Sequence, residues 1–308
     1  MRAAVITAPN TSPVYGTYPD PVGSGPDAMV VDVLAAGLHH LTRGVASGAH
    51  YAGTGVYPLV PGVDGVVRDH EGNLRYVVLD DTPLGTFAER TVIDPRRSVQ
   101  LPDGVDPVAI AAAMNPAMSS WLALRRRIDF RPGQSVLIIG ATGNSGRMAV
   151  QIAKLLGAGQ VIAVGREQTR LKSLFALGAD IATTFEDVSV AADVDVVLDY
   201  VWGEPSAEAM MSMLKARTDR GRPLTWVEIG SMAGQTAPIP SAALRAARLS
   251  VVGSGYGSVS PRDIIAELPT LARAIDDGAI EVRARALPLS EVDRAWHAET
   301  EDRIVFVP

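Results

Sequence analysis

The sequence predicts an α/β fold in which a β-rich first third precedes a parallel sheet with helices on both faces. Three observations carry this prediction. Short β-branched and apolar runs recur in the first third, strand and helix patterns alternate from Arg131 onward, and a glycine-spaced turn joins an apolar strand to an amphipathic helix. Such alternation is typical of a parallel sheet because each crossover helix covers one of its faces.

The first third reads as short strands separated by turns. The expected strands are residues 2–7, 29–35, 61–67, 74–79 and 87–93, and a segment rich in Pro, Gly and Ser fills 11–27. Residues 109–114 and 121–124 have the apolar pattern of helices. Because proline lacks a backbone N–H and crowds the preceding turn, we expect the helix to break at Asn115 and Pro116.

Beyond Arg131 the expected elements follow one another closely. The expected strands are 136–139, 161–164, 180–184, 194–198, 225–229 and 249–252, and the helices between them are 145–156, 168–177, 205–216 and 241–247. They are followed by a helix at 261–277, an extended segment at 280–287, a short helix at 290–299 and a strand at 303–307.

The glycine-spaced turn predicts a nucleotide site. Glycines at 140, 143 and 146 follow an apolar strand and open a helix. Glycine leaves room for a diphosphate, while free N–H groups and the positive end of the helix dipole point at it. Glycines also serve ordinary tight turns, but here strand, turn, helix and second strand arrive in order. The expected diphosphate-binding residues are Gly140, Thr142, Gly143, Asn144, Ser145 and Gly146.

The end of the second strand predicts which dinucleotide binds. A free ribose 2′-hydroxyl usually meets Asp or Glu here, whereas a 2′-phosphate requires Arg and no acid. Gly165 and Arg166 stand at this position, and Arg170 follows one helical turn later. We therefore expect NADPH as the cofactor; the alternative is a solvated arginine at a helix start.

The amino-acid composition limits which classes of function are possible. Hydrophobic residues make up 47% and charged residues 20% of 308 residues, which indicates a well-packed globular protein of two domains. A net charge of −6 argues against nucleic acid or an anionic membrane as the main partner. With no cysteine, disulfides, thiol nucleophiles and zinc–thiolate sites are excluded. The first apolar run is too short for a signal peptide or membrane span, so we expect a cytoplasmic protein.

Several short motifs occur along the chain in an order and spacing that resemble those of a known family. They occupy residues 34–48, 58–65, 85–89, 140–146, 177–180, 194–199 and 304–308. Over nearly its whole length the chain resembles the medium-chain dehydrogenase/reductases, in their zinc-independent quinone oxidoreductase branch. The resemblance implies a doubly wound Rossmann domain, 116–255, inserted into a GroES-like β-barrel catalytic domain, 1–115 and 256–308. It also implies an active-site cleft at their junction and a homodimer.

The metal ligands of the family's zinc enzymes are missing here. Those enzymes place a Cys ligand where this chain has His39, a His ligand at Val63 and a third ligand near Asn115. A catalytic zinc needs three protein ligands, and valine cannot coordinate. His39, His40 and Asp64 form a conceivable replacement set. We expect no metal.

Hydride transfer from a nicotinamide is the chemistry that remains. Reduction of a simple ketone normally needs Lewis-acid polarisation, whereas a quinone or an α,β-unsaturated carbonyl is already polarised. We therefore expect a quinone or enone reductase in which orientation and exclusion of water supply most of the catalysis.

The resemblance also suggests catalytic residues. Tyr51 corresponds to a loop tyrosine of the family, as substrate contact or proton donor; the alternative is an aromatic filling the barrel rim. His39 corresponds to an asparagine near the nicotinamide and is a candidate polar contact or proton source, against a purely structural histidine. Asp64 is expected to order the cleft; otherwise it is a turn carboxylate.

Further cofactor contacts are expected beside the nicotinamide and at the carboxyl ends of the later strands, where ligands bind in such sheets. They are Asn115, Ser119, Tyr200, Gly230, Ser231, Gly253, Ser254 and Gly255. Tyr200 is equally consistent with packing of the sheet edge. Two rival functions stay open: a non-catalytic NADPH-binding redox sensor, and an alcohol dehydrogenase with an unusual metal site.

Overall fold

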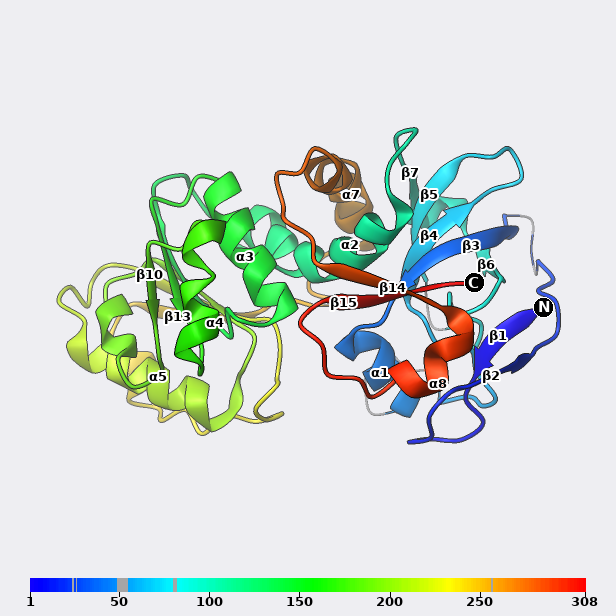
Figure 1. The fold of residues 1–308 in the computed structure, drawn as a ribbon. Coiled ribbons are helices and arrows are strands. Elements are labelled where there is room, and N and C mark those ends of the chain that lie inside the picture. Colours follow the sequence, from blue (N-terminus) through cyan, green and yellow to red (C-terminus); the bar gives the residue numbers. More distant parts are fainter. Residues whose placement is uncertain (24, 26, 49–54, 80–81, 256) are drawn as a thin grey trace. The chain divides into compact units, whose positions relative to one another are not determined.

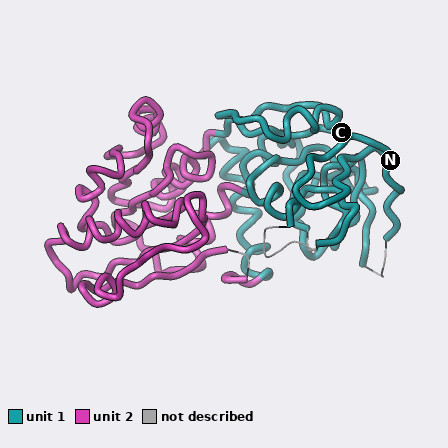
Figure 2. Tube along the Cα trace, turned by 90° about the horizontal axis from the view of Figure 1, so that it is seen from below, with its two compact units in different colours: residues 1–115, 261–278, 282–308 teal, residues 116–260, 279–281 magenta. Residues whose placement is uncertain are grey.

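The structure is a computed structural model of residues 1–308 and describes all of them except 24, 26, 49–54, 80–81 and 256 (Figure 1). The chain divides into two compact units (Figure 2). Unit 1 contains Met1–Asn115, Pro261–Gly278 and Val282–Pro308, and unit 2 contains Pro116–Ser260 and Ala279–Glu281. Unit 1 therefore combines early and late parts of the sequence, whereas unit 2 is nearly continuous.

Unit 1 is built on a largely antiparallel sheet. Its strands are β3 (Met29–Gly37), β4 (Asp64–Arg68), β5 (Leu74–Val78), β6 (Arg90–Ile93), β7 (Ser98–Gln100), β14 (Ala284–Pro288) and β15 (Arg303–Val307). They run in the order β14-β15-β3-β4-β5-β7, with β6 on β3. Strands β1 (Arg2–Val5) and β2 (Val14–Thr17) form a separate hairpin. Late strand β15 pairs with early strand β3, so the sheet needs both parts of the chain.

The core of unit 1 is centred on Phe87. Its ring meets the ring of Phe306 on β15 edge to face, with centroids 5.1 Å apart, and that of Trp296 at 6.4 Å. The helical segments of this unit are α1 (His40–Ser47), η1 (Pro95–Arg97), α7 (Pro261–Asp276), η5 (Leu289–Glu291) and α8 (Val292–Ala295). The boundary between the units falls within α2 (Pro107–Leu122).

Unit 2 contains a six-stranded parallel sheet in the order β10-β9-β8-β11-β12-β13. The strands are β8 (Ser135–Ile139), β9 (Gln160–Val164), β10 (Ile181–Thr183), β11 (Val196–Asp199), β12 (Leu224–Glu228) and β13 (Leu249–Gly253). The helical segments are η2 (Ala123–Arg127), α3 (Asn144–Leu155), α4 (Gln168–Lys172), η3 (Phe175–Leu177), η4 (Val188–Ala191), α5 (Gly203–Ala216) and α6 (Ala243–Ala246). The strand order reverses direction between β8 and β11, which is where such sheets bind their ligands.

The α/β prediction is confirmed, and the parallel strands lie close to their expected ranges. Buried Met210 and Met213 of α5 pack with Leu137 and Trp226 of the sheet, while α3 packs on β8 and β9. Three expected helices are shorter: α4 ends at Lys172, α6 is only Ala243–Ala246, and 290–299 holds only η5 and α8. Helix α1 lies in a segment where we expected no helix.

The expected helix break at Asn115 and Pro116 is wrong. Helix α2 continues from Pro107 to Leu122 with Pro116 inside it, and a π-helical turn, η2, follows. A proline inside a helix costs about 3 kcal/mol. Burial of the apolar side chains from Ile110 to Ala117 offsets this cost, since each buried methylene contributes about 0.8 kcal/mol.

Helix α2 together with η2 is also long and apolar enough to cross a membrane. Residues Pro107–Arg127 form a 21-residue helical run with a mean hydropathy of 1.2 in its most apolar window. Within the protein 72% of that window is buried, as in the core helix of a folded domain. Length and composition alone are weak evidence for a membrane span.

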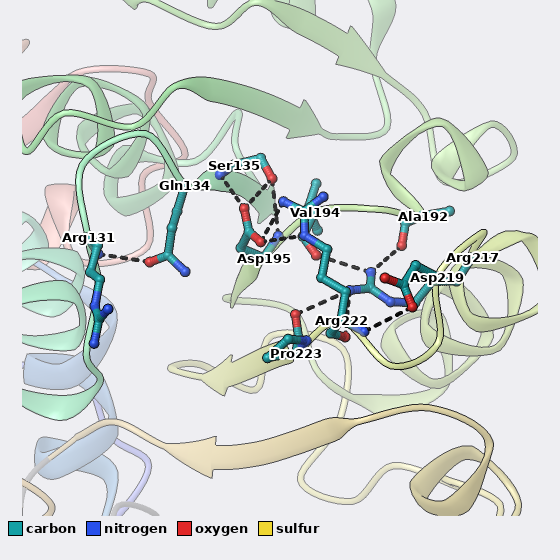
Figure 3. A network of polar contacts seen from close by, with 10 residues as sticks. All are labelled: Arg131, Gln134, Ser135, Ala192, Val194, Asp195, Arg217, Asp219, Arg222 and Pro223. Atoms are coloured by element: carbon teal, nitrogen blue, oxygen red, sulfur yellow. Dashed lines mark hydrogen bonds and ion pairs between the residues drawn. The ribbon is translucent and has the colours of Figure 1, made fainter.

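A polar network holds the amino ends of the parallel strands together (Figure 3). Asp195, just before β11, accepts hydrogen bonds from the N–H and hydroxyl of Ser135, both at 2.8 Å. Arg217 after α5 is 4% exposed and donates to the carbonyls of Ala192, Val194, Arg222 and Pro223. The network lies at the sheet edge opposite to the glycine turn, so it stabilises the fold without entering the candidate site.

Candidate functional site

The turn after β8 carries the expected diphosphate-binding residues. The N–H groups of Gly140 and Ala141 donate to the carbonyl of Val164, at 3.0 and 2.9 Å, and so tie the turn to β9. Gly143 is the N-cap of α3 and has no side chain with which to cap the helix beginning at Asn144. The first N–H groups of a helix have no intrahelical acceptor, and the dipole is positive there. This helix start therefore suits an anion.

The three glycines of the turn have different physical roles. Gly140 has φ +83°, a left-handed conformation that favours glycine. A Cβ on Gly146 would lie 2.3 Å from the carbonyl oxygen of Gly140 and 2.6 Å from Cα of Ala141, so this glycine allows the helix to pack on the turn. A Cβ on Gly143 would meet only the Gly140 oxygen, at 3.5 Å. Gly143 therefore leaves open space where a diphosphate would approach, and the residues present fit that group.

The end of β9 lies against the same turn. A Cβ on Gly165 would lie 2.8 Å from Cγ2 of Thr142, so Gly165 gives room to a turn residue. Arg166 follows and is exposed, and Arg170 on α4 is half-buried. The candidate 2′-phosphate residues thus stand next to the candidate diphosphate turn. Asn144 and Ser145 are half-buried within it.

Other expected contacts meet at the carboxyl edge of the sheet. A Cβ on Gly140 would lie 3.4 Å from Cβ of Tyr200, and one on Gly230 would lie 3.1 Å from the Tyr200 carbonyl oxygen. Gly230 and Ser231 follow shortly after β12, which ends at Glu228. The folded sheet therefore brings the ends of β11 and β12 to the glycine turn.

The end of β13 adds Gly253 and two neighbours. The N–H of Ser254 donates to the carbonyl of Glu228, at 2.8 Å, and the carbonyl of Gly253 accepts from Nε of Arg127, at 2.7 Å. The N–H of Gly255 donates to the Ser258 hydroxyl at 2.8 Å. These backbone groups are engaged within the protein.

Tyr200 is held as a packed side chain. Its hydroxyl lies 3.0 Å from the Ser119 hydroxyl, which itself donates to the carbonyl of Pro116 at 2.6 Å. Burial raises the pKa of Tyr200 to about 12. The phenol is therefore neutral at ordinary pH and locks the end of β11 to α2. Asn115 is half-buried on α2, within unit 1.

Asp199, which we did not single out as a site residue, organises the loop after β11. Its Oδ1 accepts from the N–H groups of Val201 and Trp202 and from the Ser206 hydroxyl, and its Oδ2 accepts from Nε1 of Trp226. Trp202 has φ +53°, which is rare for a residue with a side chain. The sequence signal was an acidic residue ending an apolar strand.

In unit 1 the structure brings two expected residues together. Nε2 of His39 and Oδ1 of Asp64 are 2.8 Å apart, with both side chains at most 4% exposed. The geometry of this contact does not meet the angle of a hydrogen bond, so the two atoms form only a close polar contact. Two unexpected residues extend the cluster. The Tyr76 hydroxyl donates to Oδ2 of Asp64 at 2.5 Å, and the Thr42 hydroxyl lies 3.0 Å from Nδ1 of His39.

Cationic side chains surround this cluster. Arg303 on β15 donates to the carbonyl of Leu38 at 2.8 Å, and burial lowers its pKa to about 10 against the opposing effect of Asp64. Burial also lowers the pKa of Arg43. The pKa of His40 is lowered by burial and then by the charges of these two arginines and His39. The cluster is therefore electropositive apart from Asp64.

The remaining expectations for this region concern Tyr51 and a metal ion. Tyr51 lies outside the described residues. Among the described residues no group of three His, Cys, Asp or Glu side chains is gathered as for a metal ion. His39 and Asp64 are two potential donors, and Val63 between β4 and the preceding turn has none.

Comparison with known proteins finds relatives similar to this chain in sequence and in fold. The family model for zinc-binding dehydrogenases matches residues 146–275. The probable NADPH-dependent quinone reductase tdiC of Emericella nidulans is 30% identical over 361 aligned positions, covering 100% of both chains. The quinone oxidoreductase of Thermus thermophilus, solved also with NADPH, has a TM-score of 0.80, 25% identity and full coverage of both chains. A thermostable alcohol dehydrogenase from Pyrobaculum aerophilum has a TM-score of 0.81 and 26% identity, covering 100% of this chain and 99% of that one.

Proposed function

Because the chain belongs to the medium-chain dehydrogenase/reductase superfamily, in its quinone oxidoreductase branch, we propose that it is an NADPH-dependent reductase of a quinone or an α,β-unsaturated carbonyl. The observation that carries the proposal is the turn from Gly140 to Gly146, where Gly143, of the three glycines, leaves space for a ligand. The comparisons support an oxidoreductase that uses a nicotinamide cofactor.

In the proposed complex the start of α3 holds the diphosphate, and Gly143 allows it to approach the backbone. Arg166 pairs with the 2′-phosphate, with Arg170 as a second charge. When bound, the reduced nicotinamide supplies a hydride. Tyr200, Gly230 and the residues after β13 form the wall of the cofactor site, and the hydrogen bonds of Asp199 fix the loop that joins them.

The proton that accompanies hydride transfer is assigned to His39. Its ring lies against Asp64, which orients it, and the surrounding arginines suit an oxygen that gains negative charge. Tyr51 is retained as a proposed substrate contact. A histidine with a carboxylate partner is a common general acid or base in proteins.

Metal-free chemistry is part of the proposal. Val63 offers no donor atom at the position of a family ligand, and Nε2 of His39 is turned to Asp64. The similarity to an alcohol dehydrogenase, together with the donor pair His39 and Asp64, favours a metal-dependent alcohol dehydrogenase as the second candidate. A cytoplasmic homodimer with a small-molecule substrate, and without nucleic acid or membrane partners, completes the proposal.

The test is NADPH oxidation by the purified protein in a strong chelator. A para-quinone, an enone, an enal and a simple ketone are offered separately, and each reaction is repeated with NADH. We expect turnover with the quinone or an alkene, none with the ketone, and a preference for NADPH.

Three other results of this assay would favour a different function. Activity that disappears on chelation and returns with zinc favours the alcohol dehydrogenase. NADPH binding measured by fluorescence, without turnover of any acceptor, favours the redox sensor. Absence of NADPH binding would overturn the whole assignment.

A further inference from the structure

The loop that follows β11 holds one residue in a costly backbone conformation. Trp202 has φ +53° and ψ −164°, close to a region that only glycine enters freely. Such a conformation persists only where the surrounding structure enforces it, and it is typical of functional sites. A glycine would follow the same chain path without the cost, so the chain path alone does not account for a tryptophan.

Asp199 enforces this conformation from the end of β11. Its Oδ1 accepts from the N–H groups of Val201 and Trp202, at 2.9 and 3.0 Å, and from the Ser206 hydroxyl at 2.9 Å. The N–H of Ala233 in turn donates to the carbonyl of Val201 at 2.8 Å. The main chain leading to Trp202 is therefore fixed, and with it the point at which the indole ring leaves the loop.

Two tryptophans bond to Asp199, and their indole N–H groups differ. Trp226 is fully buried and donates its Nε1–H to Oδ2 of Asp199 at 2.9 Å. Trp202 is half-buried against the same apolar core, and its indole N–H has no hydrogen-bond partner within the described residues. That N–H is not enclosed either, so it reaches solvent. A buried indole N–H usually finds an acceptor in the protein, whereas the free donor of Trp202 is available to a ligand.

The loop borders the glycine turn that carries the candidate diphosphate site. A Cβ on Gly140 would lie 3.0 Å from Cγ2 of Val201. A Cβ on Gly203 would lie 3.0 Å from the carbonyl carbon of Ala233, in the segment that follows β12. The two neighbours of Trp202 in the chain therefore contact the two segments that form the carboxyl edge of the parallel sheet, where ligands bind in such folds.

We propose that Trp202 is a cofactor contact whose indole N–H donates to an oxygen of the bound dinucleotide. The inference rests on the proposed function, since it takes the ligand of this edge to be NADPH. The fixed main chain sets where the ring leaves the loop, and the apolar core holds part of the ring while its N–H stays free. Phosphate and ribose oxygens are suitable acceptors for a group that can only donate.

The first test is the affinity of the purified protein for NADPH, measured by isothermal calorimetry. Trp202→Phe keeps an aromatic ring and removes the N–H, so the dissociation constant should rise about tenfold. Trp202→Gly and Trp202→Ala remove the whole ring, and both should bind NADPH at least about tenfold more weakly. Wild-type affinity in Trp202→Phe would overturn the proposal.

Urea unfolding separates contact with the cofactor from packing. Trp202→Gly should have a higher urea midpoint than Trp202→Ala, because glycine accepts this backbone conformation and alanine does not. A higher midpoint in Trp202→Ala would show that the backbone is not strained, and would contradict the proposal. Trp296→Phe is the matched control, since Trp296 packs against Phe87 in the core of unit 1. It should lower the midpoint and leave the affinity for NADPH unchanged.

The indole ¹H–¹⁵N signal of Trp202 gives a direct readout. Protein labelled at tryptophan contains four indole groups, and the signal lost in Trp202→Phe belongs to Trp202. Addition of NADPH should shift this signal and slow its exchange with water, while the signal of Trp296 stays in place. An unmoved Trp202 signal at saturating NADPH would refute the contact.

Turnover distinguishes this inference from the proposed function. Wild type that reduces an acceptor, with Trp202 variants that bind NADPH as wild type does, would defeat the inference and leave the proposed function standing. The expected losses of affinity without turnover of any acceptor would defeat the proposed function and leave the contact standing. Absence of NADPH binding by wild type would defeat both.

Discussion

Asp199 and Glu228 lie directly opposite each other at the carboxyl ends of the neighbouring parallel strands β11 and β12. Asp199 is fully buried and accepts hydrogen bonds on both oxygens. Glu228 is half-buried, and burial together with the charge of Asp199 raises the pKa of its carboxyl. Glu228 therefore keeps its proton to a higher pH than a free glutamate does.

This pairing predicts a pH-dependent stability. A carboxyl with a raised pKa in the folded protein binds its proton more tightly there than in the unfolded chain. The stability is complete below the unfolded pKa and decreases as the pH rises through the folded pKa. Glu228→Gln should remove this decrease, so that urea unfolding shows little change near pH 4 and a more stable variant at about pH 8.

Glu208→Gln is the control, since Glu208 is exposed on α5. Its free energy of unfolding should follow the wild-type pH profile. An unaltered profile in Glu228→Gln would show that folding does not raise the pKa of Glu228.

The glycine turn predicts a contrast between two alanine variants. Gly146→Ala would place Cβ 2.3 Å from the backbone oxygen of Gly140, so the turn must shift, and we expect a loss of about 2–3 kcal/mol in the free energy of unfolding. Gly143→Ala meets nothing closer than 3.5 Å and has φ −76°, so the fold should be retained. Its NADPH affinity should fall at least tenfold because the methyl group occupies the diphosphate position.

Isothermal calorimetry and urea unfolding of both variants check this contrast. Full NADPH affinity in a folded Gly143→Ala variant would mean that no diphosphate approaches this part of the turn.

Arg166 predicts the choice between the two nicotinamide cofactors. Arg166→Asp should weaken NADPH binding by about 100-fold, because a phosphate contact becomes a repulsion, while NADH binding changes little. Arg131→Asp is the matched charge change at the opposite edge of the sheet, where Arg131 is exposed beside Asp129. It should leave both affinities unaltered, and dissociation constants from fluorescence titration provide the measurement. Equal losses for both cofactors would refute the role of Arg166.

The buried guanidinium of Arg217 predicts a stability effect without a change in activity. Arg217→Met leaves the carbonyls of Ala192, Val194, Arg222 and Pro223 without their donor, and we expect a loss of about 3 kcal/mol. Arg222→Met removes a half-exposed partner of Asp195 and should cost less than about 1 kcal/mol. Thermal unfolding followed by circular dichroism compares the two. If both variants were equally stable, water would be satisfying the carbonyl groups that Arg217 otherwise bonds.

The sequence predicted the parallel sheet because its strands are short apolar runs separated by glycine and helix signals. Helix α1 was not predicted, since Thr42, Arg43 and Gly44 interrupt its apolar spacing and the helix depends on packing of Thr42 and Ala46. At Pro116 the sequence instead predicted a break in α2 that the structure does not have. Burial of its neighbours decided the local structure, and burial is a tertiary property.

The candidate site was predictable only where its residues are close in sequence. The turn from Gly140 to Gly146 is one local motif with a local physical reason. The partners of His39 come from β4, β5 and β15, and the register that places Tyr76 on Asp64 is set by the pairing of whole strands. Arg303 comes from a strand more than two hundred positions away along the chain. No spacing rule connects such residues.

The interleaved chain path imposes an order on folding during synthesis. The strands of unit 2 lie between Ser135 and Gly253, so its parallel sheet forms once this stretch has left the ribosome. Strand β3 is made much earlier, yet its neighbour β15 is among the last strands to emerge. The first part of unit 1 must therefore wait, with an open sheet edge, while a complete second domain folds behind it. During that interval the end of β3 at Ala36 and Gly37 lacks its partner strand, and an unpaired strand edge is prone to association with other chains.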